Sequence, residues 1–287
     1  MSLTIGLTGS NGWLGSHVKK ALESQSFLVV DLNHITRNLN DRPKQKEKKK
    51  LNWVFHFAAK TNIIDSFDNP FDLYKNNLIS TLTAIEVASI NKAKLLYLSS
   101  YIYGNPDYNP IDEKHKVRPN NPYMNSKWIA EQLCTSICKQ LHIPLTVFRT
   151  FNIYGPGLKK GRLISDLLQN ILNGEDLLLN DSKPIRDYLY VEDFIDLVLC
   201  LLKTKKSSDG IFNVGSGQSH SNLEVAQAIQ TLTSSQSQIK ILSKPRKNDI
   251  VLCTMNNKKI RTHFNWVPKY NLSKGLSHTF QKINQVV

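Results

Sequence analysis

The chain of 287 residues lacks any long hydrophobic run. No stretch approaches the roughly 20 apolar residues that a membrane span needs. The first ten residues, MSLTIGLTGS, lack the charged and apolar regions of a secretory signal. These absences predict a cytoplasmic protein that has no membrane partner.

Cysteine is scarce, and the four cysteines include no C-x-x-C pair. They are Cys134, Cys138, Cys200 and Cys253. A zinc site needs further Cys or His ligands at set spacings, and the neighbouring sequence offers none. We therefore expect reduced, mostly buried thiols and no metal site.

Acidic residues are fewer than basic ones, which gives a formal net charge of +14. Six basic residues crowd into the segment from Arg42 to Lys50, which contains no aromatic side chain that could stack on a nucleic-acid base. The segment is typical of a solvated loop, so we expect no nucleic-acid partner. A basic balance also suits a substrate that carries a diphosphate.

Apolar residues make up 40% of the chain, and short runs of them alternate with helical patterns. The expected strands are Leu3–Leu7, Phe27–Asp31, Trp53–Ala58, Lys94–Ser99 and Leu145–Phe151. This alternation predicts an α/β fold, a Rossmann-type doubly wound parallel sheet with a smaller C-terminal substrate-binding region. The expected boundaries are 1–152 for the Rossmann-type domain, with about 186–207 returning to it, and 153–185 with 208–287 for the smaller region.

A glycine-rich turn, Thr8 to Gly15, follows the first expected strand and precedes a helix. Gly9 permits the tight turn, Gly12 lets the backbone approach a pyrophosphate, and Gly15 lets the helix pack on the strand. The N–H groups at the start of that helix favour anions. A purely structural turn would give the same spacing.

Asp31 ends the next strand, 22 residues after Gly9. Its carboxylate can accept hydrogen bonds from an adenosine ribose and would repel a 2′-phosphate, which favours NAD over NADP. Arg37, six residues later, weakens that preference.

Tyr123 and Lys127 open another expected helix and lie four residues apart, so both side chains share one face. We expect them to lie beside an apolar stripe of Ile129, Leu133 and Ile137. A nearby ammonium would lower the pKa of the phenol and let it exchange a proton with a sugar hydroxyl. The spacing alone also arises by chance.

Further motifs follow one another along the whole chain. In order they are Thr8–Gly15, His56–Ala59, Asn77 with Ser80–Thr81, Ser99–Gly104, Tyr123–Lys127, Arg149–Gly157, Arg186–Tyr188, Val191–Asp193, Phe212–Gly215, Arg246 with Asp249, and Trp266 with Pro268. With these motifs the chain resembles the extended short-chain dehydrogenase/reductase family, in its NAD-dependent nucleotide-sugar epimerase and dehydratase branch.

The resemblance implies a role for each matching residue. Tyr123 would be the acid/base, Lys127 its pKa modulator and a ligand of the nicotinamide ribose, and Ser99 the hydrogen-bond partner of the reacting sugar oxygen. His56 is better interpreted as a structural histidine. The implied cofactor-binding residues are Gly9, Asn11, Gly12, Trp13, Leu14, Gly15, Asp31, Ala58, Ala59, Tyr123 and Lys127. The implied substrate-binding residues are Asn77, Ser99, Tyr101, Asn152, Arg186 and Arg246.

Two departures from the family pattern narrow the expected reaction. Asp31 stands only 25 residues before His56, where longer members carry a further strand and helix that contact adenine. Ser100 and Tyr101 stand where dehydratases place an Asp and a Glu. We therefore expect an NAD(P)-dependent enzyme that transfers a hydride at C4 of a nucleoside-diphosphate sugar, as a homodimer. The motifs favour an epimerase, and the missing adenine contact keeps an NDP-4-keto-(6-deoxy)sugar reductase open as the alternative. A non-catalytic NAD-binding or RNA-binding relative is a more distant alternative.

Overall fold

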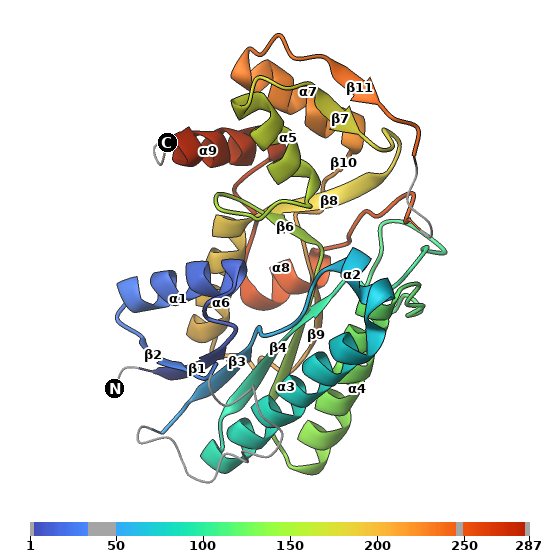
Figure 1. Cartoon of the computed structure of the whole chain (residues 1–287). Coiled ribbons are helices and arrows are strands. Elements are labelled where there is room, and N and C mark those ends of the chain that lie inside the picture. The colour runs from blue at the N-terminus through green and yellow to red at the C-terminus, as the bar shows by residue number, and fades with distance from the viewer. Residues whose placement is uncertain (1–2, 34–49, 245–248, 285–287) are drawn as a thin grey trace. The chain divides into compact units, whose positions relative to one another are not determined.

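The computed structural model describes residues 3–33, 50–244 and 249–284, and it leaves the side chains of residues 63–65 undescribed. These residues form two compact units (Figure 1). The first unit comprises residues up to Gly104, Val117–Thr150 and Leu197–Phe212, and the second comprises Asn105–Lys116, Phe151–Asp196 and Asn213 onward. The expected domain boundaries differ from these units at 105–116, 151–152, 186–196 and 208–212, and as a statement about folding units they stay a prediction.

The first unit is built on a parallel sheet. Its strands are β1 (Thr4–Thr8), β2 (Leu28–Asp31), β3 (Trp53–His56), β4 (Lys94–Ser100) and β5 (Leu145–Thr150), and β9 (Gly210–Val214) continues into the second unit. Their order is β2-β1-β3-β4-β5-β9, and the four pairings from β2 to β5 are parallel. The Rossmann-type fold predicted from the sequence is confirmed.

Helices follow the strands in the manner that a parallel sheet requires. They are α1 (Trp13–Ser24), α2 (Ile63–Asp68), α3 (Pro70–Asn91), α4 (Pro122–Gln140) and α6 (Val191–Lys203), of which α6 begins in the second unit. β1 and β3 are buried along their whole length, because helices cover both faces of the sheet. Helices α3 and α4 pack side by side (Figure 1).

Helix α4 buries a different face from the one its apolar pattern predicts. Pro122 occupies its first turn, and the side chain of Asn121 caps it by accepting a hydrogen bond from the Met124 N–H. Its buried side chains are Met124, Ser126, Lys127, Ala130, Glu131, Cys134 and Cys138, whereas Ile129, Leu133 and Ile137 are half-buried. The expected stripe is therefore only partly buried, with Ile137 packed against the core, and the fully buried face includes Lys127 and Glu131.

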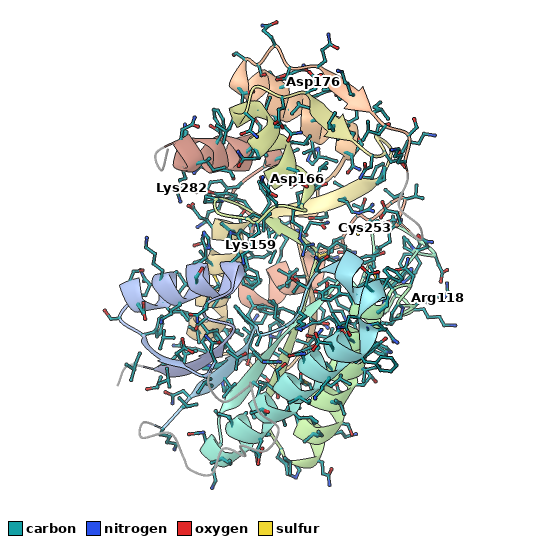
Figure 2. All side chains as sticks on the ribbon, viewed as in Figure 1. Arg118, Lys159, Asp166, Asp176, Cys253 and Lys282 are labelled. Carbon is teal, nitrogen blue, oxygen red and sulfur yellow. The ribbon has the colours of Figure 1, made fainter. Side chains whose placement is uncertain are left out.

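The second unit contains two small sheets and several helices. One sheet joins β6 (Asn152–Tyr154), β8 (Ile185–Tyr190) and β10 (Ser219–Ser221), and the other joins β7 (Leu177–Leu179) and β11 (Ile239–Ile241). Its helices are α5 (Leu163–Leu172), α7 (Asn222–Thr233), α8 (Lys258–Phe264) and α9 (Leu272–Asn284). Lys159, labelled in Figure 2, lies in the loop before α5, where its carbonyl accepts a hydrogen bond from Ser165.

The cysteines are free thiols. Cys134, Cys138 and Cys253 are buried and Cys200 is half-buried. Among the helices described, none has the length and apolar character to cross a membrane.

Candidate active site

The glycine-rich turn joins β1 to α1 through close backbone contacts. Gly9 has a φ of +72°, and a Cβ there would lie 2.7 Å from the Ala58 nitrogen. A Cβ on Gly15 would lie 2.0 Å from the Gly9 oxygen, so only glycine lets α1 approach the strand this closely. Gly12 caps α1 without a side-chain hydrogen bond. The turn therefore leaves the start of α1 suited to an anion.

The end of β2 is tied to this turn by a polar network. Ser10 Oγ donates to Asp31 Oδ2 at 2.5 Å. The Asn33 side chain accepts from the Gly9 N–H at 2.7 Å and donates to Ser10 Oγ at 2.6 Å. Asn33 was missed in the sequence, although an Asn two residues after a strand-ending Asp is a turn signal that could have indicated it. Arg37 lies outside the described residues.

His56 is held between two threonines at the end of β3. Its Nδ1 lies 2.8 Å from Thr8 Oγ1 and its Nε2 lies 3.0 Å from Thr81 Oγ1. Burial, and then the nearby charge of Lys127, lower the pKa of His56 to about 3. The ring is therefore neutral and structural, as the sequence indicated. Ala58 and Ala59 follow in a half-buried loop.

Asn77, on α3, connects that loop to the start of α4. Its side-chain oxygen accepts from the Lys60 N–H at 2.8 Å, and its NH₂ group donates to the Lys60 carbonyl at 3.2 Å and to Ser126 Oγ at 2.9 Å. Both N–H groups of the amide are thus used inside the protein. Asn77 supports the backbone beside the first turn of α4, and its direct contact with a substrate stays a prediction.

Tyr123 and Lys127 lie in the first two turns of α4. The Lys127 ammonium is buried, 4.4 Å from the centre of the Tyr97 ring, and the Tyr97 hydroxyl donates to the Lys127 carbonyl at 3.2 Å. Burial lowers the pKa of Lys127 to about 8, although the nearby Glu131 carboxylate opposes the shift. A lysine with this pKa still carries its charge at neutral pH.

Ser99, near the end of β4, faces α4 and is 2% exposed. Its hydroxyl donates to Glu131 Oε2 at 2.7 Å. Glu131 is itself fully buried and pairs with Arg149 of β5 at 2.5 Å. The sequence analysis did not single out Glu131. Its spacing of four residues from Lys127 was the available signal, because it puts both charges on one helical face.

The remaining substrate-binding residues predicted from the sequence lie in different places. Tyr101 is buried, and its hydroxyl donates to the Gly104 carbonyl at 2.5 Å. In the second unit, the Asn152 amide donates to the Asp187 carbonyl at 3.1 Å, and Arg186 pairs with Asp249 at 2.7 Å. Arg246 lies outside the described residues. Substrate contact by these residues stays a prediction.

Asp187 fixes the strand that carries Arg186. Its carboxylate is fully buried and accepts hydrogen bonds from Ser216 N, Ser216 Oγ and Gly217 N at 2.7 to 2.8 Å. Burial raises the pKa of Asp187 to about 6, against the effect of these hydrogen bonds. Arg186 is therefore presented from a strand that is firmly anchored at its neighbouring residue.

A Rossmann-type sheet, a glycine turn at a helix N-terminus and a buried lysine one turn after a tyrosine define a nicotinamide-cofactor enzyme. Residues 5–215 match the model of the NAD dependent epimerase/dehydratase family, and the chain belongs to this family. The family and the NAD(P) dependence expected from the sequence are confirmed.

Individual relatives are similar along most of their length. UDP-glucuronic acid decarboxylase 1 of Xenopus tropicalis is 29% identical over 305 residues, which cover 95% of this chain and 70% of the relative. UDP-glucose 4-epimerase of Lactobacillus helveticus is 27% identical over 91% of each chain. The structure of UDP-glucuronic acid 4-epimerase from Bacillus cereus, in complex with UDP-glucuronic acid and NAD, has a TM-score of 0.89 at 22% identity and covers 99% of this chain and 100% of its own.

Proposed function

We propose that this protein is an NAD(P)-dependent nucleotide-sugar epimerase that acts at C4 of a nucleoside-diphosphate sugar. The observation that supports it best is the buried Lys127 ammonium, one helical turn after Tyr123 and close to the Tyr97 ring. The family match and the 4-epimerases among the relatives add to it.

The cofactor fits the residues of the first unit. The start of α1 would present N–H groups to a pyrophosphate, and Gly12 at its N-cap has no side chain to hold the phosphates away from the backbone. Asp31, oriented by Ser10 and Asn33, would accept hydrogen bonds from the adenosine ribose. When bound, the nicotinamide would supply an acceptor and then a donor of hydride for the sugar carbon.

The chain's own residues move the proton and hold the reacting group. Tyr123 takes the proton of the C4 hydroxyl, and the positive charge of Lys127 favours the phenolate that does so. Ser99 contacts the sugar oxygen. Arg186 and Asn152 bind the diphosphate, for which a guanidinium offers paired donors. After the 4-keto sugar rotates in the site, the same groups carry out the reverse proton transfer on its other face.

NAD is the proposed form of the cofactor. The carboxylate of Asp31 would lie beside the adenosine ribose and repel a 2′-phosphate. Ser10 and Asn33 hold that carboxylate at the end of β2, which supports a fixed recognition role.

We also propose that the protein is a cytoplasmic homodimer. Helices α3 and α4 pack on each other, and each leaves large apolar side chains partly exposed: Leu82 on α3, and Ile129, Leu133 and Ile137 on α4. A second copy that packs on these helices would bury them. Light scattering on the purified protein should give twice the mass of the chain, and a monomeric mass at micromolar concentration would rule the dimer out.

One assay separates epimerase from 4-ketoreductase. We expect the purified protein, supplied with NAD, to interconvert UDP-glucose and UDP-galactose without net absorbance change near 340 nm, where reduced nicotinamide absorbs. A reductase would leave both sugars unchanged and would consume NADH or NADPH stoichiometrically with UDP-4-keto-6-deoxyglucose. That second outcome would replace the proposed reaction.

A further inference from the structure

The described part of the first unit contains a cavity of about 330 Å³ at the amino ends of β1, β3 and β4. These strands are neighbours in the sheet, and their carboxyl ends carry or lead to the glycine turn, His56 and Ser99 (Figure 1). The cavity therefore lies at the sheet edge opposite to these residues of the candidate active site. Its volume is at the lower end of the range for small-molecule sites, about 300–1,000 Å³.

Three lysines line this cavity, and among the described lining residues none is acidic. Lys50 precedes β3, Lys92 follows α3 and Lys94 begins β4. All three are exposed, and in the described part of the chain none of their ammonium groups has a carboxylate partner. Lysines elsewhere in the protein do have such partners, in the pairs Lys60–Asp72, Lys240–Asp176, Lys269–Asp196 and Lys282–Glu192. The lysines of the cavity thus remain available to an anion from solution.

The ends of two helices offset this positive charge only in part. Helices α3 and α6 both end at the cavity. A helix C-terminus carries about −0.5 of an elementary charge, so two of them balance about one of the three ammonium groups. The lysines therefore exceed what the helix ends need, and a net charge of about +2 remains for a ligand.

Buried apolar side chains also line the cavity. Leu51, Trp53 and Leu201 contribute to its wall and are almost completely buried. The Lys94 ammonium lies 5.2 Å from the centre of the Trp53 ring, which is a cation–π contact. This contact holds Lys94 against the wall of the cavity, so a ligand has less side-chain freedom to restrict when it binds.

We propose that this cavity is an accessory binding site for a ligand that carries a diphosphate or triphosphate group. A polyvalent anion can satisfy several ammonium groups at once, whereas one carboxylate satisfies fewer, and lysine binds phosphate as a compact point charge. Inorganic pyrophosphate and a nucleotide share this chemistry, and the apolar wall offers a contact to the organic part of a nucleotide. The inference is independent of the proposed reaction, because it uses no residue of the candidate active site.

Calorimetric titration of inorganic pyrophosphate, with excess NAD present to fill the glycine turn, tests the site. We expect the wild-type protein to bind pyrophosphate, and Lys92→Gln and Lys94→Gln each to raise its dissociation constant about tenfold, as for one charge-assisted hydrogen bond lost. The matched control is Lys274→Gln, because the Lys274 ammonium is also exposed and lies 4.4 Å from the centre of the Tyr270 ring. The control should bind as the wild type does. No binding by the wild-type protein, or an equal loss in the control, would overturn the proposal.

The lysine variants should fold. Each substitution removes one of three like charges around the cavity, so we expect melting temperatures equal to or above that of the wild type. Weaker pyrophosphate binding by these variants would then report the lost contact and not a damaged fold.

The fluorescence of Trp53 reports both the location and the identity of the ligand. A phosphate that engages Lys94 draws the ammonium from the ring, and Trp53→Phe removes this signal while it keeps the lysines. We expect pyrophosphate and UDP to change the fluorescence of the wild-type protein more than that of Trp53→Phe. Tighter binding of UDP would identify a nucleotide site and equal affinity a site for the phosphates alone, and both support the proposal. Equal changes in the wild type and in Trp53→Phe with both probes would place the ligand elsewhere and refute it.

Discussion

Helix α4 buries two charged side chains, Glu131 and Lys127, on the same face, and the protein stabilises their charges to different extents. Glu131 is paired with Arg149 through charge-assisted hydrogen bonds. Lys127 lies over the Tyr97 ring, and burial dominates the shift of its pKa. An uncompensated buried charge costs stability, so its retention points to a function that needs the charge.

Tyr123→Phe should remove the proton transfer and leave the fold intact, because the ring and its packing are kept. We expect turnover to fall 10²-fold or more, as for other general acid/base residues, with little change in thermal stability or cofactor binding. Tyr108→Phe is a matched control, because Tyr108 is half-exposed and its hydroxyl donates to Asp112. Retention of more than about a tenth of the turnover by Tyr123→Phe would show that another group is the acid/base.

Lys127→Met should stabilise the cofactor-free protein near pH 7 and inactivate it. The pKa of Lys127 is about 8 in the folded protein, below the ordinary lysine value of 10.5, so the unfolded chain binds more protons between these two pH values and wild-type stability rises with pH there. Below pH 8 the burial penalty is complete, on the order of 3 kcal/mol for a shift of this size.

Urea unfolding of both proteins at pH 7 and pH 9.5 measures this effect. The Met variant should be more stable at pH 7, and its advantage should shrink at pH 9.5 as the wild-type lysine loses its proton. If the difference in unfolding free energy between the two proteins stays constant with pH, packing at residue 127 causes it, and the ammonium charge does not.

At the level of elements, strands were easier to predict than the buried face of a helix. The runs Lys94–Ser99 and Leu145–Phe151 became β4 and β5 within a residue at each end, because strands of a parallel sheet are apolar on both faces. The buried face of α4 was predicted only in part, since hydrophobic periodicity cannot show that Glu131 will find Arg149 from a strand 18 residues away in sequence.

Hydrogen bonds join the glycine turn to the end of β2, and Asp31→Asn tests the proposed role of this unit in cofactor recognition. Asn keeps an oxygen that can accept from the Asn33 N–H, turns its NH₂ group toward Ser10 Oγ, and removes the negative charge beside the ribose. We expect the NAD preference over NADP to narrow on the order of tenfold, because the repulsion of a 2′-phosphate is lost. Dissociation constants for both cofactors, measured by titration, check this. Equal or tighter binding of NADP to the wild-type protein would reverse the assignment.

For the whole molecule, the order of motifs along the sequence identified the family, because it fixes which strand ends carry which side chains. The direction of the Ser99 hydrogen bond could not be predicted in this way, since it depends on Glu131 and Arg149 meeting in the folded protein. The net charge of +14 is consistent with an anionic substrate but does not name it.

The enzyme should not catalyse the 4,6-dehydration of a nucleotide sugar. Elimination of water from a sugar needs a general acid and a general base beside C5 and C6. At the two positions where dehydratases carry that pair, this chain has Ser100 and Tyr101, and the Tyr101 hydroxyl donates to the Gly104 carbonyl. Incubation of the protein with NAD and either UDP-glucose or dTDP-glucose should therefore yield no 4-keto-6-deoxy sugar by mass spectrometry. Detection of a product 18 Da lighter than the substrate, about the mass of one water, would show that another acid and base replace the missing carboxyl pair.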